Sequence, residues 1–339
     1  MHLPTILSSL GLMAGAMAST VPHSVISRQA PVGQNVVYWG QGSGKGDLSL
    51  YCTEAAGVDV VVLAFLYQWG RGVKRPSGVI GPLCYISPQG QPQNCEPLAA
   101  QIAKCQQAGV KVILSLGGAT SSYTLESRAE AEEIGQYLWD SYGNSGNNNV
   151  PHPFGKAFVN GWDFDIEVPY GSPYYQYMIE AIRRNFASDP ANTYYITGAP
   201  QCPIPEPNMG EMISKSKFDW LFVQFYNNNN YTVPCSLPFN GNAPFNYHNW
   251  TNFISSTPSK DAKIFIGVPA SKLAANGNTS GATYYITPAQ LSTLIREYKT
   301  DSHFGGIMMW EAGYSDKNVV NGCTYAQNGK RILTTGSPC

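Results

Sequence analysis

Eight short apolar segments, rich in β-branched and aromatic residues, recur along the chain at fairly even intervals. Most of them are continuously hydrophobic, which is typical of strands that are buried on both faces of a sheet. The predicted strands are residues 35–40, 58–66, 110–118, 161–168, 194–200, 218–226, 263–270 and 304–310. Burial on both faces favours a parallel sheet over an antiparallel one.

Segments with the hydrophobic spacing of amphipathic helices separate several of these strands. Gly109 suits the C-cap of the first helix, and Thr287 followed by Pro288 suits the start of the last. The predicted helices are residues 97–109, 127–143, 174–186 and 287–298. Alternating strands and helices imply right-handed βαβ units. Eight repeats therefore predict a closed (β/α)8 TIM barrel, an α/β fold with a single domain.

A doubly wound open sheet with a phosphate-binding loop is the alternative architecture. The segment GQGSGKGD, residues 40–47, follows the first predicted strand and superficially suits such a loop. However, Trp39 stands at the first glycine position, and Gly46 replaces the Ser or Thr that should follow Lys45. The barrel is therefore the preferred fold, and the chain ends soon after its eighth strand in a tail that contains Gly, Asn and Thr.

The N-terminus has the features of an export signal, although no Lys or Arg precedes its apolar part. The stretch ILSSLGLMAGAMA ends in Ala16-Met17-Ala18, a small-x-small site for signal peptidase. It is shorter than the ~20 apolar residues that a membrane span needs, and no other segment suits a membrane anchor. We expect a secreted, extracellular protein with these parts: a signal peptide at 1–18, an N-terminal segment or short propeptide at 19–34, and the barrel domain at 35–339.

The composition narrows the class of ligand. Of the 339 residues, 43% are hydrophobic and 13% are charged, and the formal net charge is −1. An average soluble domain has about 25% charged residues. A nearly neutral surface gives a nucleic-acid partner no electrostatic support. An uncharged polar ligand such as a carbohydrate suits this chain better.

Eight cysteines, none of them in a C-x-x-C pair, indicate a disulfide framework formed in an oxidising compartment. Spacing alone leaves the connectivity open, although Cys84 with Cys95 and Cys323 with Cys339 are able to close short loops. Sequons also permit N-glycosylation, and the candidate acceptors are Asn230, Asn249 and Asn278.

Three acids occupy alternate positions in the segment GWDFDIEVP, residues 161–169. Side chains of a strand alternate between its faces, so Asp163, Asp165 and Glu167 should point together into the barrel. Burying several unpaired carboxylates is costly, so at least one of them should be protonated. A neutral carboxylic acid is what general acid catalysis requires. Glu167 lies nearest the carboxyl-terminal rim, where barrel enzymes keep their active sites.

A buried ionic network and a divalent metal site are the alternatives for these three acids. Inward layers of such barrels normally consist of Val, Ile and Leu, so a purely structural role is a poor explanation. The five histidines are scattered along the chain and do not accompany the acids, which disfavours a metal. We therefore expect catalysis without a metal or another cofactor.

The segment NGWDFDIE resembles the D-G-x-D-x-D-x-E strand motif of glycoside hydrolase family 18, the chitinases and their relatives. Asn160 stands at the first motif position, where the family has Asp. Further motifs of the family have counterparts in the right order, and the first of them is similar to the plant class III and small fungal chitinases. These counterparts are YWGQ (38–41), SLGG (115–118), APQC (199–202), QFYNN (224–228) and MMWE (308–311).

The resemblance implies a retaining mechanism in which the substrate supplies its own nucleophile. Glu167 would act as general acid and base, and Asp165 would orient the acetamide group of the sugar. Asp163 would share a proton or a hydrogen bond with Asp165. Tyr226 would donate its hydroxyl to the acetamide oxygen. Asn160, near the start of the strand, would be a supporting position. Because Asn lacks the negative charge of the family's Asp, the pKa values of the remaining acids would be lower.

Further residues are candidates for substrate binding. Trp310 offers a flat apolar face to the sugar, and Gly117 and Gly118 would let the backbone approach closely. Gln224 and Asn227 supply neutral hydrogen bonds. The cleft lining is completed by Tyr38, Gln41 and Phe65.

By the same resemblance, the disulfides pair Cys52 with Cys105, Cys84 with Cys95, and Cys202 with Cys235, and they leave Cys323 with Cys339. We expect a monomeric endochitinase that acts on chitin or N-acetylglucosamine oligosaccharides. An endo-β-N-acetylglucosaminidase that cuts N-glycans is one alternative function. A non-catalytic lectin or inhibitor on the same scaffold is another.

Overall fold

The computed structural model describes residues 1, 32–41, 46–120, 122–239 and 243–339. The predicted signal peptide after Met1, most of the 19–34 segment and Lys45 therefore lie outside the described residues. The barrel reaches slightly further toward the N-terminus than the predicted boundary at residue 35. Its first strand begins at Gln34, and the backbone N–H of Val32 donates to Leu333 O at 3.2 Å.

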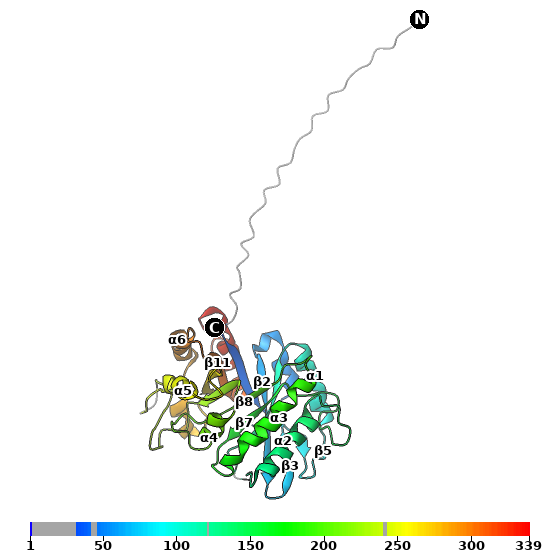
Figure 1. Cartoon of the computed structure of the whole chain (residues 1–339). Coiled ribbons are helices and arrows are strands. Elements are labelled where there is room, and N and C mark those ends of the chain that lie inside the picture. The colour runs from blue at the N-terminus through cyan, green and yellow to red at the C-terminus, as the bar shows by residue number, and fades with distance from the viewer. Residues whose placement is uncertain (2–31, 42–45, 121, 240–242) are drawn as a thin grey trace.

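Eight parallel strands form a closed barrel with helices packed around it (Figure 1). Their order is β1-β11-β10-β9-β8-β7-β6-β2, and β1 also pairs with β2, which closes the ring. The strands are β1 (Gln34–Trp39), β2 (Val60–Gly70), β6 (Lys111–Gly118), β7 (Gly161–Ile166), β8 (Tyr195–Gly198), β9 (Trp220–Gln224), β10 (Lys263–Pro269) and β11 (Phe304–Trp310). Each coincides with a predicted segment, and the predicted TIM barrel is confirmed.

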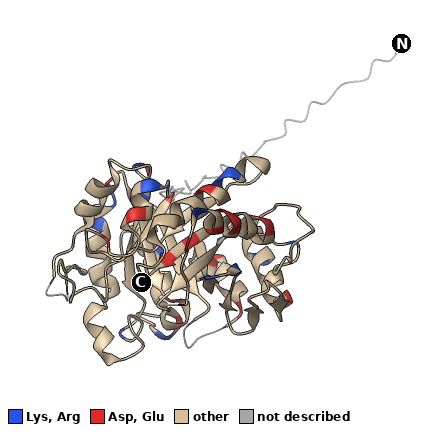
Figure 2. Ribbon diagram, turned by 60° about the horizontal axis from the view of Figure 1, so that its bottom comes forward, with Lys and Arg blue, Asp and Glu red and all other residues tan. Residues whose placement is uncertain are grey.

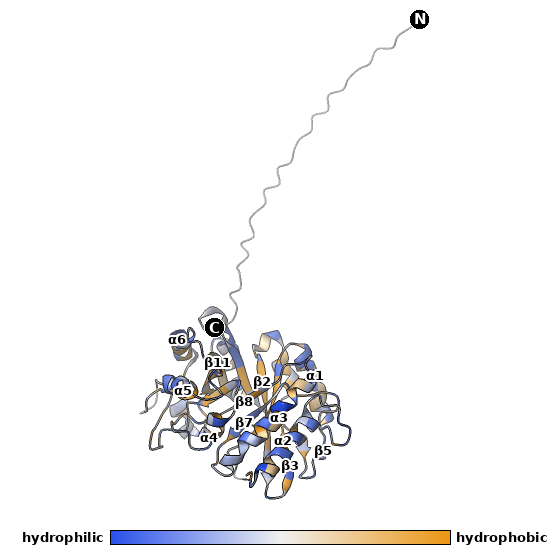
Figure 3. Ribbon diagram, viewed as in Figure 1, coloured by the Kyte–Doolittle hydropathy of each residue, from blue (hydrophilic) through white to orange (hydrophobic). Residues whose placement is uncertain are grey.

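The strands separate two apolar layers, as the two-sided hydrophobic runs predicted. Trp162, Phe164 and Ile166 of β7 belong to the outer layer, which lies between the strands and the helices. A smaller inner layer fills the barrel and includes Val62 and Phe222. Figure 3 shows hydrophobic colour concentrated on the strands, while the helices carry more polar colour. The acids of β7 therefore project to the inside.

All four predicted helices are present. The described part of the chain also contains helices that the hydrophobic pattern did not indicate. The pattern missed them because they are short or lie in polar segments. The predicted helices are α1 (Glu96–Gln107), α2 (Arg128–Tyr142), α3 (Tyr175–Arg184) and α6 (Pro288–Tyr298). The additional helices are α4 (Gly210–Lys215), α5 (Tyr247–Ile254), α7 (Ala312–Lys317) and α8 (Tyr325–Thr335).

An antiparallel extension, also not predicted, continues the sheet from β2 beyond the barrel. It consists of β3 (Val73–Ile80), β4 (Cys84–Ile86) and β5 (Pro92–Gln93), in the order β2-β3-β4-β5. The four disulfides join the pairs that the family resemblance implied: Cys52–Cys105, Cys84–Cys95, Cys202–Cys235 and Cys323–Cys339.

The surface is sparsely charged. Figure 2 shows Lys, Arg, Asp and Glu as short coloured segments on a mostly tan ribbon. Asn230, Asn249 and Asn278 are exposed, so the geometry is compatible with glycans at these sequons. None of the helices among the described residues combines the length and hydrophobicity that crossing a membrane requires.

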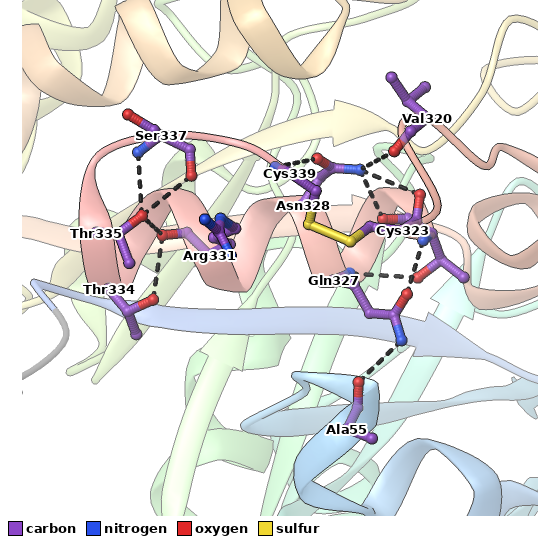
Figure 4. Close-up of a disulfide and its surroundings, with 11 residues drawn as sticks. Ala55, Val320, Cys323, Gln327, Asn328, Arg331, Thr334, Thr335, Ser337 and Cys339 are labelled. Atoms are coloured by element: carbon purple, nitrogen blue, oxygen red, sulfur yellow. Dashed lines mark hydrogen bonds between the residues drawn. A yellow bond between two sulfur atoms is a disulfide. The ribbon is translucent and has the colours of Figure 1, made fainter.

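The C-terminal tail that contains Gly, Asn and Thr includes helix α8. Thr324 and Gln327 form a capping box at its start, and Gly336 adopts a left-handed φ of 81° at its end. Figure 4 shows how Asn328 and the Cys323–Cys339 disulfide hold the chain end against this helix. The Asn328 amide donates to Cys323 O at 3.1 Å and accepts from the Cys339 N–H at 3.0 Å.

Replacing both Cys323 and Cys339 by Ser should lower the free energy of unfolding by about 3 kcal/mol, because the bond closes a short loop in the unfolded chain. The two cysteines are 16 positions apart. Denaturant titration of the double variant against wild type measures the difference. KM should stay unchanged, since neither cysteine lines the cavity described below. Equal stability of the two proteins would contradict this account.

Candidate active site

A cavity of about 320 Å³ opens at the carboxyl ends of the barrel strands. Of the twelve predicted catalytic and substrate-binding residues, nine line it: Tyr38, Gln41, Phe65, Asp165, Glu167, Gln224, Tyr226, Asn227 and Trp310. Asp163, Gly117 and Gly118 are not among its lining residues. The structure therefore gathers residues from five strands and their following loops into one site.

Asp163 lies beneath the cavity, inside the barrel, and is fully buried. One carboxylate oxygen accepts hydrogen bonds from the hydroxyls of Tyr38 at 2.7 Å and Ser115 at 2.6 Å. The other oxygen accepts one from Thr197 at 2.7 Å. Burial raises the pKa of Asp163, and the three hydroxyls oppose that rise because they stabilise the ionised form.

Asp165 lies one layer higher, in the cavity wall, and is 4% exposed. The Gln224 amide donates to its carboxyl group at 3.0 Å. Burial raises the pKa of Asp165 well above its ordinary value, and the charges of Glu167 and Asp163 raise it further. Asp163 thus acts on Asp165 through its charge, since its own carboxylate oxygens are bonded to hydroxyls. The predicted direct hydrogen bond between the two acids is not what the described contacts show.

Glu167 follows the last residue of β7 and lines the cavity as a partly exposed side chain. Burial by the surrounding protein raises its pKa to about 7, while the amides of Gln224 and Gln201 oppose the rise. A glutamic acid with such a pKa is largely protonated in mildly acidic solution. It is therefore suited to donate a proton.

Tyr226 follows strand β9 and is 5% exposed at the cavity wall. Burial and the nearby charges of Asp165 and Glu167 raise the pKa of its hydroxyl. The phenol therefore stays protonated and remains a hydrogen-bond donor. The Asn228 amide holds this segment in place by donating to Gln224 O at 2.9 Å and Tyr226 O at 2.7 Å.

Aromatic rings form the apolar part of the cavity. Phe65 and Trp310 stack with their centroids 5.9 Å apart and an interplanar angle of 18°. Tyr38 lies 5.7 Å from the Trp310 ring, and Met308 also lines the wall. An apolar wall beside two carboxyl groups suits a sugar, which has both CH-rich faces and polar edges.

Three amides predicted to bind substrate are already occupied by the protein. The Gln224 amide nitrogen donates both to Asp165 and to Ala199 O, at 3.0 and 2.9 Å. The Gln41 amide donates to the backbone oxygens of β2 and β3. The Asn227 amide donates to Ala275 O at 2.6 Å. These side chains therefore shape the site, and their amide nitrogens are engaged in holding its walls.

Gly117 and Gly118 serve the packing of the strand end and do not face the cavity. Both have positive φ angles, 115° and 84°. A Cβ on Gly117 would meet the backbone oxygen of Asp165 at 2.1 Å, and one on Gly118 would meet the Phe65 ring at 2.9 Å. Glycine is therefore required so that β6 can approach β7 and Phe65.

Asn160, at the variant motif position, is bound to the backbone near the start of β7. Its side-chain oxygen accepts from the Val112 N–H at 2.9 Å and from the Gln106 amide at 3.1 Å. It does not contribute to the pKa shift of Asp163, which is set by burial, three hydroxyls and a backbone N–H. The effect of the missing negative charge on the three acids stays a prediction.

Sequence reasoning missed one wall of the cavity and its outer support. The wall consists of residues 274–277 and Tyr314, which follow β10 and β11. The support is a loop after β8 in which the buried Glu206 accepts from four backbone N–H groups: Gln201, Asn208, Met209 and Gly210. Gln201 in turn accepts a hydrogen bond from the Tyr231 hydroxyl. Apart from Gln201, which lies in the segment APQC, no local pattern in the sequence marks these positions.

Within the described chain, no group of three or more His, Cys, Asp or Glu side chains is arranged to hold a metal ion. The polar groups of the cavity are instead carboxyls, phenols and amides. These groups suit hydrogen bonding and proton transfer with an uncharged ligand.

Comparison with known proteins agrees with this geometry. The chain matches glycosyl hydrolases family 18 over residues 34–315. Endochitinase 2 of Metarhizium robertsii is 65% identical, over 100% of this chain and 83% of its own length.

Two solved structures share the fold. A chitinase from Ipomoea carnea is 30% identical, with a TM-score of 0.68, and the match covers 88% of this chain and 99% of that one. A xylanase and α-amylase inhibitor from Scadoxus multiflorus is 28% identical, with a TM-score of 0.66 and coverages of 89% and 98%. Because the family match spans most of the chain and a relative aligned over the whole of this chain is 65% identical, the chain belongs to glycosyl hydrolase family 18.

Proposed function

We propose that this family 18 glycoside hydrolase is a secreted endochitinase that cleaves β-1,4 linkages between N-acetylglucosamine units with retention of configuration. The observation that carries the proposal is the position of Glu167, whose pKa burial raises to about 7, at the cavity rim beside the buried Asp165. Metarhizium robertsii Endochitinase 2, at 65% identity, supports chitin as the substrate. Export rests on the sequence of residues 1–18.

In the first step, Glu167 donates its proton to the glycosidic oxygen while the bond to the anomeric carbon breaks. The carbonyl oxygen of the substrate's own acetamide group attacks that carbon and forms an oxazolinium ion. Asp165 accepts a hydrogen bond from the acetamide N–H and stabilises the positive charge. Tyr226 donates its hydroxyl to the acetamide oxygen.

In the second step, the Glu167 carboxylate takes a proton from water, which attacks the anomeric carbon and opens the oxazolinium ring. Glu167 thereby returns to its protonated form, and the product keeps the β configuration. Asp163 carries negative charge in this scheme because three hydroxyls donate to it. That charge raises the pKa of Asp165, so Asp165 keeps its own proton and accepts the acetamide N–H with its unprotonated carboxyl oxygen.

The proposal is tested by proton NMR of the products formed from defined N-acetylglucosamine oligomers. Hydrolysis inside the chain with β-anomers as the first products is the expected result. First products with the α configuration would rule out the mechanism. Release of glycans from a glycoprotein without cleavage of the oligomers would establish the N-glycan alternative.

A non-catalytic role has a specific reason to be tested, since an inhibitor protein shares the fold at 28% identity. Complete inactivity of the purified chain toward oligomers and glycoproteins would favour that role. Retention of both Glu167 and Asp165 in the cavity is the feature that argues against it.

The activity should fall as the pH rises through about 7, because Glu167 must be protonated to donate and its pKa is raised to about 7. A kcat/KM profile from pH 4 to 9 should therefore show an alkaline limb near 7. The raised pKa of Glu167 also affects stability: its contribution is present below the pKa of the unfolded chain and is lost as the pH rises through the folded value. A limb at pH 5 would mean that Glu167 has an ordinary pKa.

A further inference from the structure

We propose that Tyr123 is a positioning residue that holds the main chain of Glu167 in place for proton donation. The inference rests on the proposed function, because it concerns the group that donates the proton. It adds a residue that lies outside the predicted set and outside the cavity lining.

The backbone of Glu167 lies just beyond the regular pairing of the barrel. The register of β7 with β6 ends at Ile166, and its register with β8 ends at Phe164. The N–H of Glu167 therefore has no strand partner in these ladders. It donates instead to the Tyr123 hydroxyl at 2.9 Å.

The same hydroxyl donates to Gly118 O at 2.9 Å, at the carboxyl end of β6. Tyr123 thus bridges the ends of two neighbouring strands with one oxygen atom. Burial raises the pKa of this hydroxyl, the hydrogen bond from the Glu167 N–H opposes the rise, and the nearby charges of Asp165 and Glu167 add to it. The hydroxyl therefore keeps its proton at neutral pH and makes both hydrogen bonds at once.

The ring of Tyr123 is itself fixed. It is 1% exposed and stacks on Trp69 with the centroids 4.6 Å apart and an interplanar angle of 15°. Residues 69 and 123 also form a β-bridge, and the Thr124 N–H donates to Trp69 O at 3.2 Å. The oxygen is therefore presented from a rigid support, which restricts where the first residue after β7 is able to lie.

Removing this oxygen should affect proton donation more than substrate binding. A displacement of about 1 Å of a catalytic group is enough to lower a rate by up to ~100-fold. Without its partner, the Glu167 N–H must turn toward solvent, and the side chain moves with it. Greater exposure to water would lower the pKa of Glu167 toward its ordinary value.

The test is Tyr123→Phe, which keeps the stacked ring and deletes only the oxygen. We expect kcat on N-acetylglucosamine oligomers to fall about 10-fold, with KM changed less than 2-fold, and the alkaline limb to move to lower pH. On a 4-nitrophenyl glycoside of the disaccharide, whose leaving group departs without protonation, the loss should be less than about 3-fold.

Tyr142→Phe is the matched control. Tyr142 is buried equally well, and its hydroxyl has no hydrogen-bond partner among the described residues. That variant should match wild type on both substrates, and both variants should be checked by near-UV circular dichroism. Wild-type activity of Tyr123→Phe, or an equal loss on the two substrates, would overturn the inference. An inactive wild-type enzyme would instead overturn the proposed function.

Discussion

Glu167→Gln is expected to lower kcat on N-acetylglucosamine oligomers by about 10³-fold, within the range of general acid–base catalysis. Glutamine preserves the shape of the side chain and its place beside Gln224 and Gln201, but it has no proton to give to the glycosidic oxygen. KM should change little, because the side chain at position 167 contributes to the cavity wall both as Glu and as Gln. Steady-state rates of oligomer cleavage measure the effect.

The matching control is Glu180→Gln on the exposed face of α3, which should retain wild-type activity. Above pH 7 the Glu167→Gln variant should also be more stable than wild type, since it no longer ionises a partly buried carboxyl group. Thermal unfolding at pH 5 and pH 8 checks this second outcome. A variant that cleaves oligomers at the wild-type rate would remove Glu167 from the mechanism altogether.

Glu206→Ala is expected to destabilise the protein by about 3–5 kcal/mol, because each buried donor left without an acceptor costs about 1–3 kcal/mol and several lose their acceptor together. Glu206 is 7% exposed, and it accepts from four backbone N–H groups. Alanine would leave these donors buried without an acceptor. Denaturant titration at 25 °C measures the loss.

The variant should also lose activity, because the freed loop carries Gln201, whose amide influences the pKa of Glu167. Glu206→Gln is the informative companion, since its single amide oxygen still accepts from part of the donor set. It should lose less stability than Glu206→Ala. If alanine is tolerated within 1 kcal/mol, water must replace the carboxylate, and Glu206 does not organise this loop.

Those features of the site that depend on one short segment of the sequence were predictable. The alternation of apolar and acidic residues in β7 is a property of one strand, so the inward direction of Asp163 and Asp165 followed from strand geometry alone. The same holds for the burial of Trp162 and Phe164 against the helices. Capping residues likewise predicted α6 from Thr287 and Pro288.

Other assignments were incomplete because a side chain's partner is chosen by residues distant in sequence. The Gln224 amide donates to Asp165, 59 positions earlier in the chain. The sequence had predicted that this amide donates to the substrate. Gly117 is required by the backbone of the neighbouring strand, and no pattern within its own strand reveals that neighbour. Helix α8 was missed since its segment is polar and its packing against β1 comes from the far end of the chain.

The sequence by itself determined the barrel, the face that carries the three acids and, through motif resemblance, the family, since periodicity and short motifs are local. Only the tertiary structure decided which groups surround each acid. It placed Tyr123 under Glu167 and three hydroxyls around Asp163. Proton affinity depends on burial and on neighbours brought together by folding, so these properties are set in space and not along the chain.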